Sequence, residues 1–146
     1  MPTQAAGMIR LATHSDIPRI LEIRDSVGDN LLSDPNAVTE AGVVGFIDSR
    51  ALWVWQEADG LVTGFSAGDV SDGSIWALFV APGHEGKGIG RALLKRACDG
   101  LREGGHPFAI LTAAPGTRAE RHYRADGWTV TGTNQKGELV LQKPLL

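Results

Sequence analysis

The most informative part of the chain is residues 74–94, SIWALFVAPGHEGKGIGRALL. It begins as a mostly apolar, strand-like run, and Pro82 and alternating glycines then form a loop. From Ile89 apolar residues recur every four positions, with a second row beside them, which predicts one apolar face of a helix. Gly104 and Gly105 end this helix. The segment therefore predicts a strand, a glycine-rich loop and a helix in direct succession.

The loop is suited to binding phosphate, because the first N–H groups of a helix have no internal partners and carry partial positive charge. Two phosphate loops are excluded. A Walker loop needs Lys and then Ser or Thr where this chain has Ile89 and Gly90. A dinucleotide fingerprint needs glycine where the chain has Arg91, and it does not follow antiparallel hairpins. A third type, the coenzyme A loop, stays open at this point.

The elements on either side of this segment define the rest of the fold. Runs of strand-like sequence joined by Asp-Gly turns predict an antiparallel meander before the loop, and the strand after the helix returns parallel to its last member. We expect Ser15 to cap a first helix, Thr39 a second that ends near Asp48, and Thr117 a short last helix that ends at Gly127. The expected strands are residues 8–13, 51–57, 61–69, 74–80, 107–113, 128–133 and 138–143.

Bulk properties narrow the class of protein. A chain of 146 residues, 42% hydrophobic and 21% charged, fits one domain. We expect residues 1–7 to form a flexible tail and residues 8–146 a single domain. The net charge of −3 argues against a nucleic-acid partner, and no apolar stretch is long enough to span a membrane. The single cysteine, Cys98, and the absence of a secretory leader favour the cytoplasm.

Two motifs carry a resemblance to a known family. Residues 78–94 resemble the (Arg/Gln)-x-x-Gly-x-(Gly/Ala) signature of the GNAT superfamily of N-acetyltransferases, and residues 119–128, AERHYRADGW, are similar to its A-x-x-x-Y-x-x-x-G-F segment. The resemblance implies an α/β fold of the α+β type, the GNAT-like acyl-CoA N-acyltransferase fold. Its sheet is mixed, seven-stranded and mostly antiparallel, with about four helices. A V-shaped split between the fourth and fifth strands would hold acetyl-CoA.

The chain departs from the family pattern at two positions. Glu85 stands where Arg or Gln is usual, so recognition of the pyrophosphate is expected to come from backbone N–H groups, with Lys87 and Arg91 supplying positive charge. Gly116 stands where many members have Asn before the last helix, which leaves one coenzyme or acceptor contact unassigned.

The resemblance also implies a reaction and the residues that perform it. An acetyl group passes from acetyl-CoA to a primary amine of a small molecule or peptide, without a metal. Tyr123 matches the tyrosine that protonates the departing thiolate, although it could instead simply anchor a short helix. A catalytically silent CoA-binding regulatory module is the alternative function, and a homodimer is left open. The implied cofactor-binding residues are Leu78, Phe79, Val80, Gly86, Lys87, Gly88, Ile89, Gly90 and Arg91.

No carboxylate matches a general-base position of the family, where this chain has Ser74 and Leu111. Deprotonation of the amine would run through water or through Asp25, Asp69 or Asp72, each of which is otherwise a solvated surface carboxylate. The acceptor pocket is expected within residues 26–45, whose carboxylates Asp29, Asp34 and Glu40 allow an amine.

Four further side chains have two interpretations each. Arg118 could clamp an anionic group of CoA or of a carboxylated acceptor, or be a surface arginine paired with a nearby carboxylate. Trp76 could line the acceptor pocket or belong to the core. His122 is better explained as a surface imidazole than as a cleft residue, and Cys98 as a small core residue than as a nucleophile.

Overall fold

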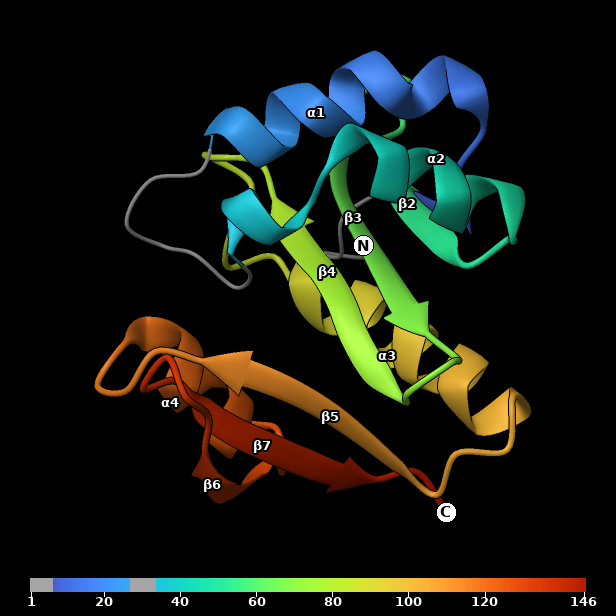
Figure 1. Cartoon of the computed structure of the whole chain (residues 1–146). Helices are drawn as coiled ribbons and strands as arrows, with labels where there is room; N and C mark the ends of the chain where they lie inside the picture. The colour runs from blue at the N-terminus through green and yellow to red at the C-terminus, as the bar shows by residue number, and fades with distance from the viewer. Residues whose placement is uncertain (1–6, 27–33) are drawn as a thin grey trace, which may run out of the picture.

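The computed structural model describes residues 7–26 and 34–146, which form a seven-stranded sheet flanked by four α-helices (Figure 1). The predicted fold class is confirmed. The strands are β1 Met8–Leu11, β2 Leu52–Gln56, β3 Val62–Asp69, β4 Ser74–Val80, β5 Phe108–Ala113, β6 Thr129–Thr133 and β7 Leu139–Pro144. The helices are α1 Ile17–Ser26, α2 Glu40–Asp48, α3 Ile89–Glu103 and α4 Arg118–Ala125, with short 3-10 helices η1 His14–Asp16 and η2 Pro35–Ala37.

The sheet runs in the order β1-β2-β3-β4-β5-β7-β6 and splits in its middle. Strands β1 to β4 pair antiparallel, as do β5, β7 and β6. The described register pairs β4 with β5 only where Ser74 faces Ile110, and the Gly73 carbonyl accepts the Ile110 N–H at 3.0 Å. Beyond this point the two strands diverge into separate wings (Figure 1). The predicted parallel pair and its V-shaped split are therefore confirmed.

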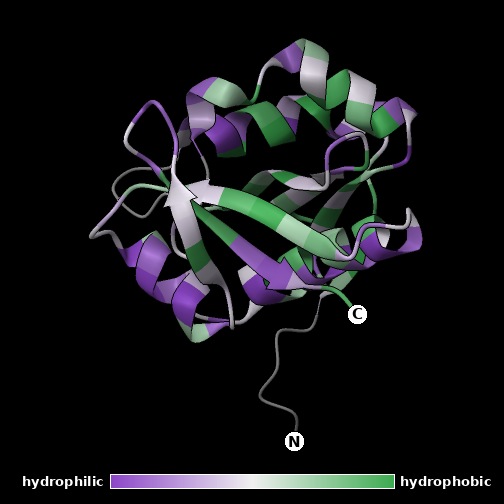
Figure 2. Ribbon diagram, turned by 60° about the horizontal axis from the view of Figure 1, so that its bottom comes forward, coloured by the Kyte–Doolittle hydropathy of each residue, from purple (hydrophilic) through white to green (hydrophobic). Residues whose placement is uncertain are grey.

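Two hydrophobic clusters hold the helices on the sheet. On one face, Ile20 of α1 and Val43 of α2 pack with Val54 and Phe65. On the other face, Leu93 and the rest of the apolar side of α3 belong to a cluster that reaches β4, β5 and α4. Because α3 contributes to this second cluster, it bridges the two wings beside the split. Figure 2 shows hydrophobic residues gathered in the sheet and on the inner sides of the helices.

The first helix begins differently from the expectation. Ser15 does not cap it: Thr13 precedes η1, and the Asp16 carboxylate accepts the Thr13 N–H at 2.8 Å. Asp16 also takes two hydrogen bonds from Arg10, at 2.8 and 2.9 Å. The arginine bonds hold the pKa of Asp16 below its usual value. A tertiary partner on β1 therefore selects the start of the helix, which local cap preference could not reveal.

Other expected boundaries agree with the structure. Thr39 caps α2 by accepting the Gly42 N–H at 3.0 Å, and Thr117 caps α4. Of the expected tail, residues 1–6 lie outside the described residues. No helix in the described part of the chain is both long enough and apolar enough to cross a bilayer.

Helix α2 carries two glycines in different surroundings. A Cβ atom built on Gly42 would lie 2.4 Å from Cζ2 of Trp76, whereas one built on Gly45 would meet nothing within 4 Å. The Trp76 ring is also held by Phe46, with ring centroids 4.4 Å apart. Gly42 thus allows α2 to sit directly on the indole of β4.

We expect Gly42→Ala to destabilise the fold by about 1–3 kcal/mol, because the new methyl group must displace Trp76. Gly45→Ala is the matched control and should stabilise it by up to about 1 kcal/mol, because alanine favours a helix interior. Urea unfolding followed by tryptophan fluorescence measures both. Equal changes in the free energy of unfolding would contradict the packing described for α2.

Candidate active site

The glycine-rich loop lies between β4 and α3 and depends on backbone conformations that favour glycine. Gly86 and Gly88 have φ angles of 78° and 84°, in the left-handed region, and Gly88 is the residue that precedes the first turn of α3. A side chain at either position would meet nothing within 4 Å. Their role is therefore to shape the backbone and to leave open space in front of the first N–H groups of α3.

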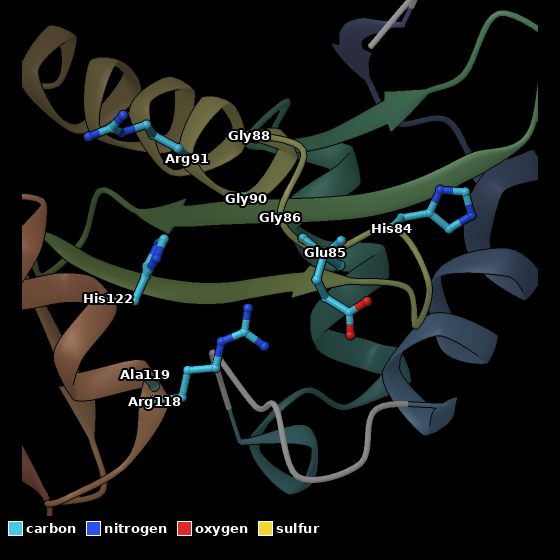
Figure 3. Close-up of a pocket in the computed structure, with 10 residues that line it drawn as sticks. His84, Glu85, Gly86, Gly88, Gly90, Arg91, Arg118, Ala119 and His122 are labelled. Atoms are coloured by element: carbon cyan, nitrogen blue, oxygen red, sulfur yellow. The ribbon is translucent and has the colours of Figure 1, made fainter. Parts of the chain in front are cut away.

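A pocket of about 140 Å³ opens in front of this loop. Figure 3 shows that its walls come from both wings of the split sheet: the loop supplies one side and α4 the other. Besides two histidines, its lining includes one carboxylate, Glu85, and two guanidinium groups, Arg91 and Arg118. The complete lining is Val80, His84, Glu85, Gly86, Gly88, Gly90, Arg91, Arg118, Ala119 and His122.

The charged groups of this pocket differ in how they are engaged. Arg91 contacts Asp126, with Nε and Oδ1 3.3 Å apart. Glu85 bends back to its own loop and accepts the Gly83 N–H at 2.7 Å. Backbone N–H groups, its own first, lower the pKa of Glu85, and the positive charge of Arg118 adds to this effect. Among the described residues, Arg118 has no hydrogen bond or ion pair from its side chain.

A second groove, of about 480 Å³, lies along the split between β4 and β5. Ile75, Trp76 and Leu111 give it apolar walls, and Asp34 and Glu138 are its charged residues. No lysine or arginine of the described chain lines it. Ala119 of α4 lines both this groove and the pocket at the loop, so the two spaces adjoin at that residue.

Tyr123 is more deeply buried than a residue lining an open cleft. Its side chain is 1% exposed, and its ring lies edge-on to Trp128, with centroids 6.0 Å apart. Burial raises its pKa well above the usual value, so the phenol is protonated at neutral pH. Tyr123 lies four residues after Ala119 and therefore on the same face of α4. That face turns toward the place where the two spaces adjoin, and the acid role of Tyr123 stays a prediction.

The three carboxylates considered as bases have structural partners. Asp69 accepts the N–H and hydroxyl of Ser71, at 3.0 and 2.6 Å, and Asp72 does the same for Ser74, at 2.9 and 2.6 Å. Asp25 contacts Arg24 at 2.8 Å. None of the three lines the loop pocket or the groove, which favours their interpretation as turn and surface residues.

The groove contains Trp76 and part of the segment expected to form the acceptor pocket. Trp76 lines the groove and also packs on Phe46, so it is both a pocket residue and a core residue. The expected acceptor segment contributes Asp34 and Ala37 to the groove but not Glu40, and Asp29 lies outside the described residues. Among residues 7–26 and 34–146, no three His, Cys, Asp or Glu side chains gather as metal ligands would.

Sequence reasoning missed some of the pocket. The preference for His122 as a surface imidazole is wrong: it is half-buried in the pocket wall, and its Nε2 is buried without a hydrogen-bond partner in the described structure. His84 Nδ1 is in the same situation. The four-residue spacing from Arg118 to His122 on one helical face was the available signal. It could be read only once α4 was known to face the loop.

Comparisons with known proteins bear on the family and the fold of the chain. Residues 7–128 match the model of the acetyltransferase (GNAT) family. Streptothricin acetyltransferase of Streptomyces lavendulae is 41% identical over 107 residues, 64% of this chain and 56% of that protein. Mycothiol acetyltransferase of Beutenbergia cavernae is 34% identical over 89 residues, 58% of this chain and 30% of that protein. The matched regions therefore span about half or less of these curated relatives.

A solved structure gives the same picture of the fold. The structure of yncA from Salmonella typhimurium, determined with its cofactor acetyl-CoA, superposes with a TM-score of 0.74 and 25% sequence identity. The superposition covers 96% of this chain and 94% of that one.

The environment of Cys98 leads to a test of its interpretation as a core residue rather than a nucleophile. The side chain lies in the cluster beneath α3, and burial raises the pKa of its thiol to about 11. Because only the thiolate is nucleophilic, we expect the native protein at pH 8 to react with Ellman's reagent about 100-fold more slowly than the urea-unfolded protein. Equal rates in the two states would show an accessible, reactive thiol and contradict the core interpretation.

Proposed function

Because this chain belongs to the acetyltransferase (GNAT) family, we propose that it transfers an acetyl group from acetyl-CoA to a primary amine of a small molecule or peptide. One observation carries the proposal: the glycine loop, the N-terminus of α3 and the split between β4 and β5 open on the same pair of adjoining spaces. We also propose a cytoplasmic location, which the single buried cysteine supports.

Acetyl-CoA would lie across the split with its pyrophosphate at the loop. The N–H groups of residues 86–91 stand at the positive end of the α3 dipole, where an anion is favoured. Because the strand ladder between β4 and β5 does not continue past Ser74, an extended pantetheine arm has room beside Phe79 and Val80. The cofactor-binding assignments of Lys87, Ile89 and Leu78 remain predictions of the same kind.

The reaction needs an amine and a thioester held together. The nitrogen lone pair attacks the thioester carbonyl carbon, and the C–S bond breaks as the amide C–N bond forms. The departing sulfur gains a proton, which we assign to the Tyr123 hydroxyl, and the ammonium formed on nitrogen loses one to water. A buried phenol with a raised pKa is protonated before each turnover, as an acid must be. Positioning of the two reactants supplies the rest of the acceleration.

The groove between β4 and β5 would receive the acceptor. Its apolar walls fit the carbon chain of an amine, while Asp34 and Glu138 favour positive charge. A carboxylate on the acceptor would lie near these two like charges, with no lysine or arginine of the described lining to offset them. The groove therefore favours amines without a carboxylate, such as decarboxylated amino acids and internal lysine side chains of peptides.

We expect Tyr123→Phe to lower kcat by about 100-fold or more, since general acids contribute on this scale, while acetyl-CoA affinity is unchanged. Trp128→Phe is the matched control: it changes the aromatic neighbour of Tyr123 to the family's residue without removing an acid, and should keep most of the turnover. CoA release over a panel of amines measures both. If Tyr123→Phe turned over as fast as the wild type, Tyr123 would not be the acid. If the wild type bound acetyl-CoA tightly but acetylated no amine in the panel, the silent CoA-binding module would be favoured.

Paired acceptors test the charge of the groove. We expect tyramine and phenethylamine to give kcat/KM values at least about tenfold above those of tyrosine and phenylalanine, because the carboxylate meets like charge. Glu138→Gln should reduce the ratio of kcat/KM for each amine to kcat/KM for its matching amino acid. Equal values for the paired acceptors, or a preference for the amino acids, would contradict the proposed acceptor class.

A further inference from the structure

The pocket at the glycine loop contains a negative charge where the coenzyme's own negative charge is proposed to bind. Glu85 lines this pocket, and its carboxylate accepts the Gly83 N–H at 2.7 Å. The side chain therefore occupies one N–H group of the loop and places like charge beside the pyrophosphate site. A pyrophosphate can bind there with useful affinity only if another group offsets Glu85.

Arg118 is positioned to provide that offset. It is the first residue of α4, and Figure 3 shows its guanidinium reaching across the pocket toward the Glu85 carboxylate. The other arginine of the pocket, Arg91, already contacts Asp126 at 3.3 Å. Lys87 does not line the pocket. Of the two arginines in the described lining, Arg118 is therefore the one whose N–H donors make no hydrogen bond within the protein.

The start of α4 keeps Arg118 available. The nearest carboxylate on its own helix, Glu120, accepts the Gly116 N–H at 2.7 Å and pairs with Arg124 at 2.7 Å. Thr117 fixes the first turn by accepting the Glu120 N–H at 3.3 Å. Glu120, the nearest carboxylate on α4, is therefore engaged elsewhere, and the carboxylate whose charge interacts with Arg118 is Glu85 across the pocket.

We propose that Glu85 and Arg118 act as a pair across the split, in which Glu85 positions the Arg118 guanidinium and Arg118 binds the pyrophosphate of CoA. The cation thus comes from α4, instead of from the first loop position, where the family usually has Arg or Gln. The planar guanidinium has five N–H donors, so it can bind a carboxylate on one side and a phosphate on the other. The inference rests on the proposed use of acetyl-CoA and adds the residues that recognise it.

The test is a double-mutant cycle read by calorimetric acetyl-CoA binding. We expect Arg118→Gln to weaken affinity about 10- to 100-fold, because it removes charged hydrogen bonds and exposes the pyrophosphate to Glu85. Glu85→Gln alone should change affinity less than Arg118→Gln does, because losing the partner that positions Arg118 weakens binding while losing the like charge beside the pyrophosphate strengthens it. Added to Arg118→Gln, the same substitution should recover much of the lost affinity. Arg121→Gln, which removes a charge from α4 outside the pocket, is the control and should bind like wild type.

Dephospho-CoA identifies the phosphate, since it keeps the pyrophosphate and lacks the 3′-phosphate. We expect Arg118→Gln to weaken the binding of CoA and of dephospho-CoA by the same factor. A loss seen with CoA alone would assign Arg118 to the 3′-phosphate and overturn the proposal. The proposal would equally be overturned if Arg118→Gln bound acetyl-CoA as tightly as Arg121→Gln does. It would also be overturned if adding Glu85→Gln to Arg118→Gln recovered none of the lost affinity.

Failure of the Glu85–Arg118 proposal can be distinguished from failure of the proposed transferase function. Wild-type protein that binds acetyl-CoA without turning over any amine would refute the transferase activity, and the binding cycle would still decide the pair. Wild-type protein that binds no acetyl-CoA would refute both. Unfolding midpoints of the four variants, compared with wild type, exclude loss of fold as the cause of weak binding.

Discussion

The short contact between β4 and β5 is the constraint on which the rest of the structure depends. Hydrogen bonding that begins where Ser74 faces Ile110 and does not continue leaves a wedge between two otherwise well-paired wings. Helix α3 packs against both wings through one shared hydrophobic cluster. Because the loop before α3 leaves β4 at the wide end, the helix N-terminus and the split face the same space. An anion and an extended chain can thus be held by one geometry.

The two wings contribute different chemistry to that space. The β4 wing provides backbone: a loop whose glycines accept positive φ angles and whose N–H groups suit phosphate. The β5 wing provides side chains, through Arg118, Ala119 and His122 on one face of α4. In the proposed binding mode the substrates would contact both wings at once, and the small side chain of Ala119, which lines both spaces, would leave room for the chain of the coenzyme.

Much of the fold could be predicted from the sequence because its signals are local. The strand at residues 74–80 and the helix from Ile89 agree with the structure, since period, proline and glycine mark them. The start of the first helix could not be predicted, because Arg10 on a different element holds Asp16. The same limit applied to the site: the loop was visible, but His122 and the orientation of Arg118 depend on how α4 packs against it.

The central claim is that acetyl-CoA occupies the split with its pyrophosphate at the loop. Titration of isotope-labelled protein with acetyl-CoA, followed through backbone amide chemical shifts, tests this most directly. The account predicts saturable shifts that are largest at Gly86, Gly88 and Gly90 and at the β4 residues Phe79 and Val80, with little change in β1 or β2. Shifts that are absent from the loop, cluster on the α1–α2 face, or arise equally with ATP would contradict it.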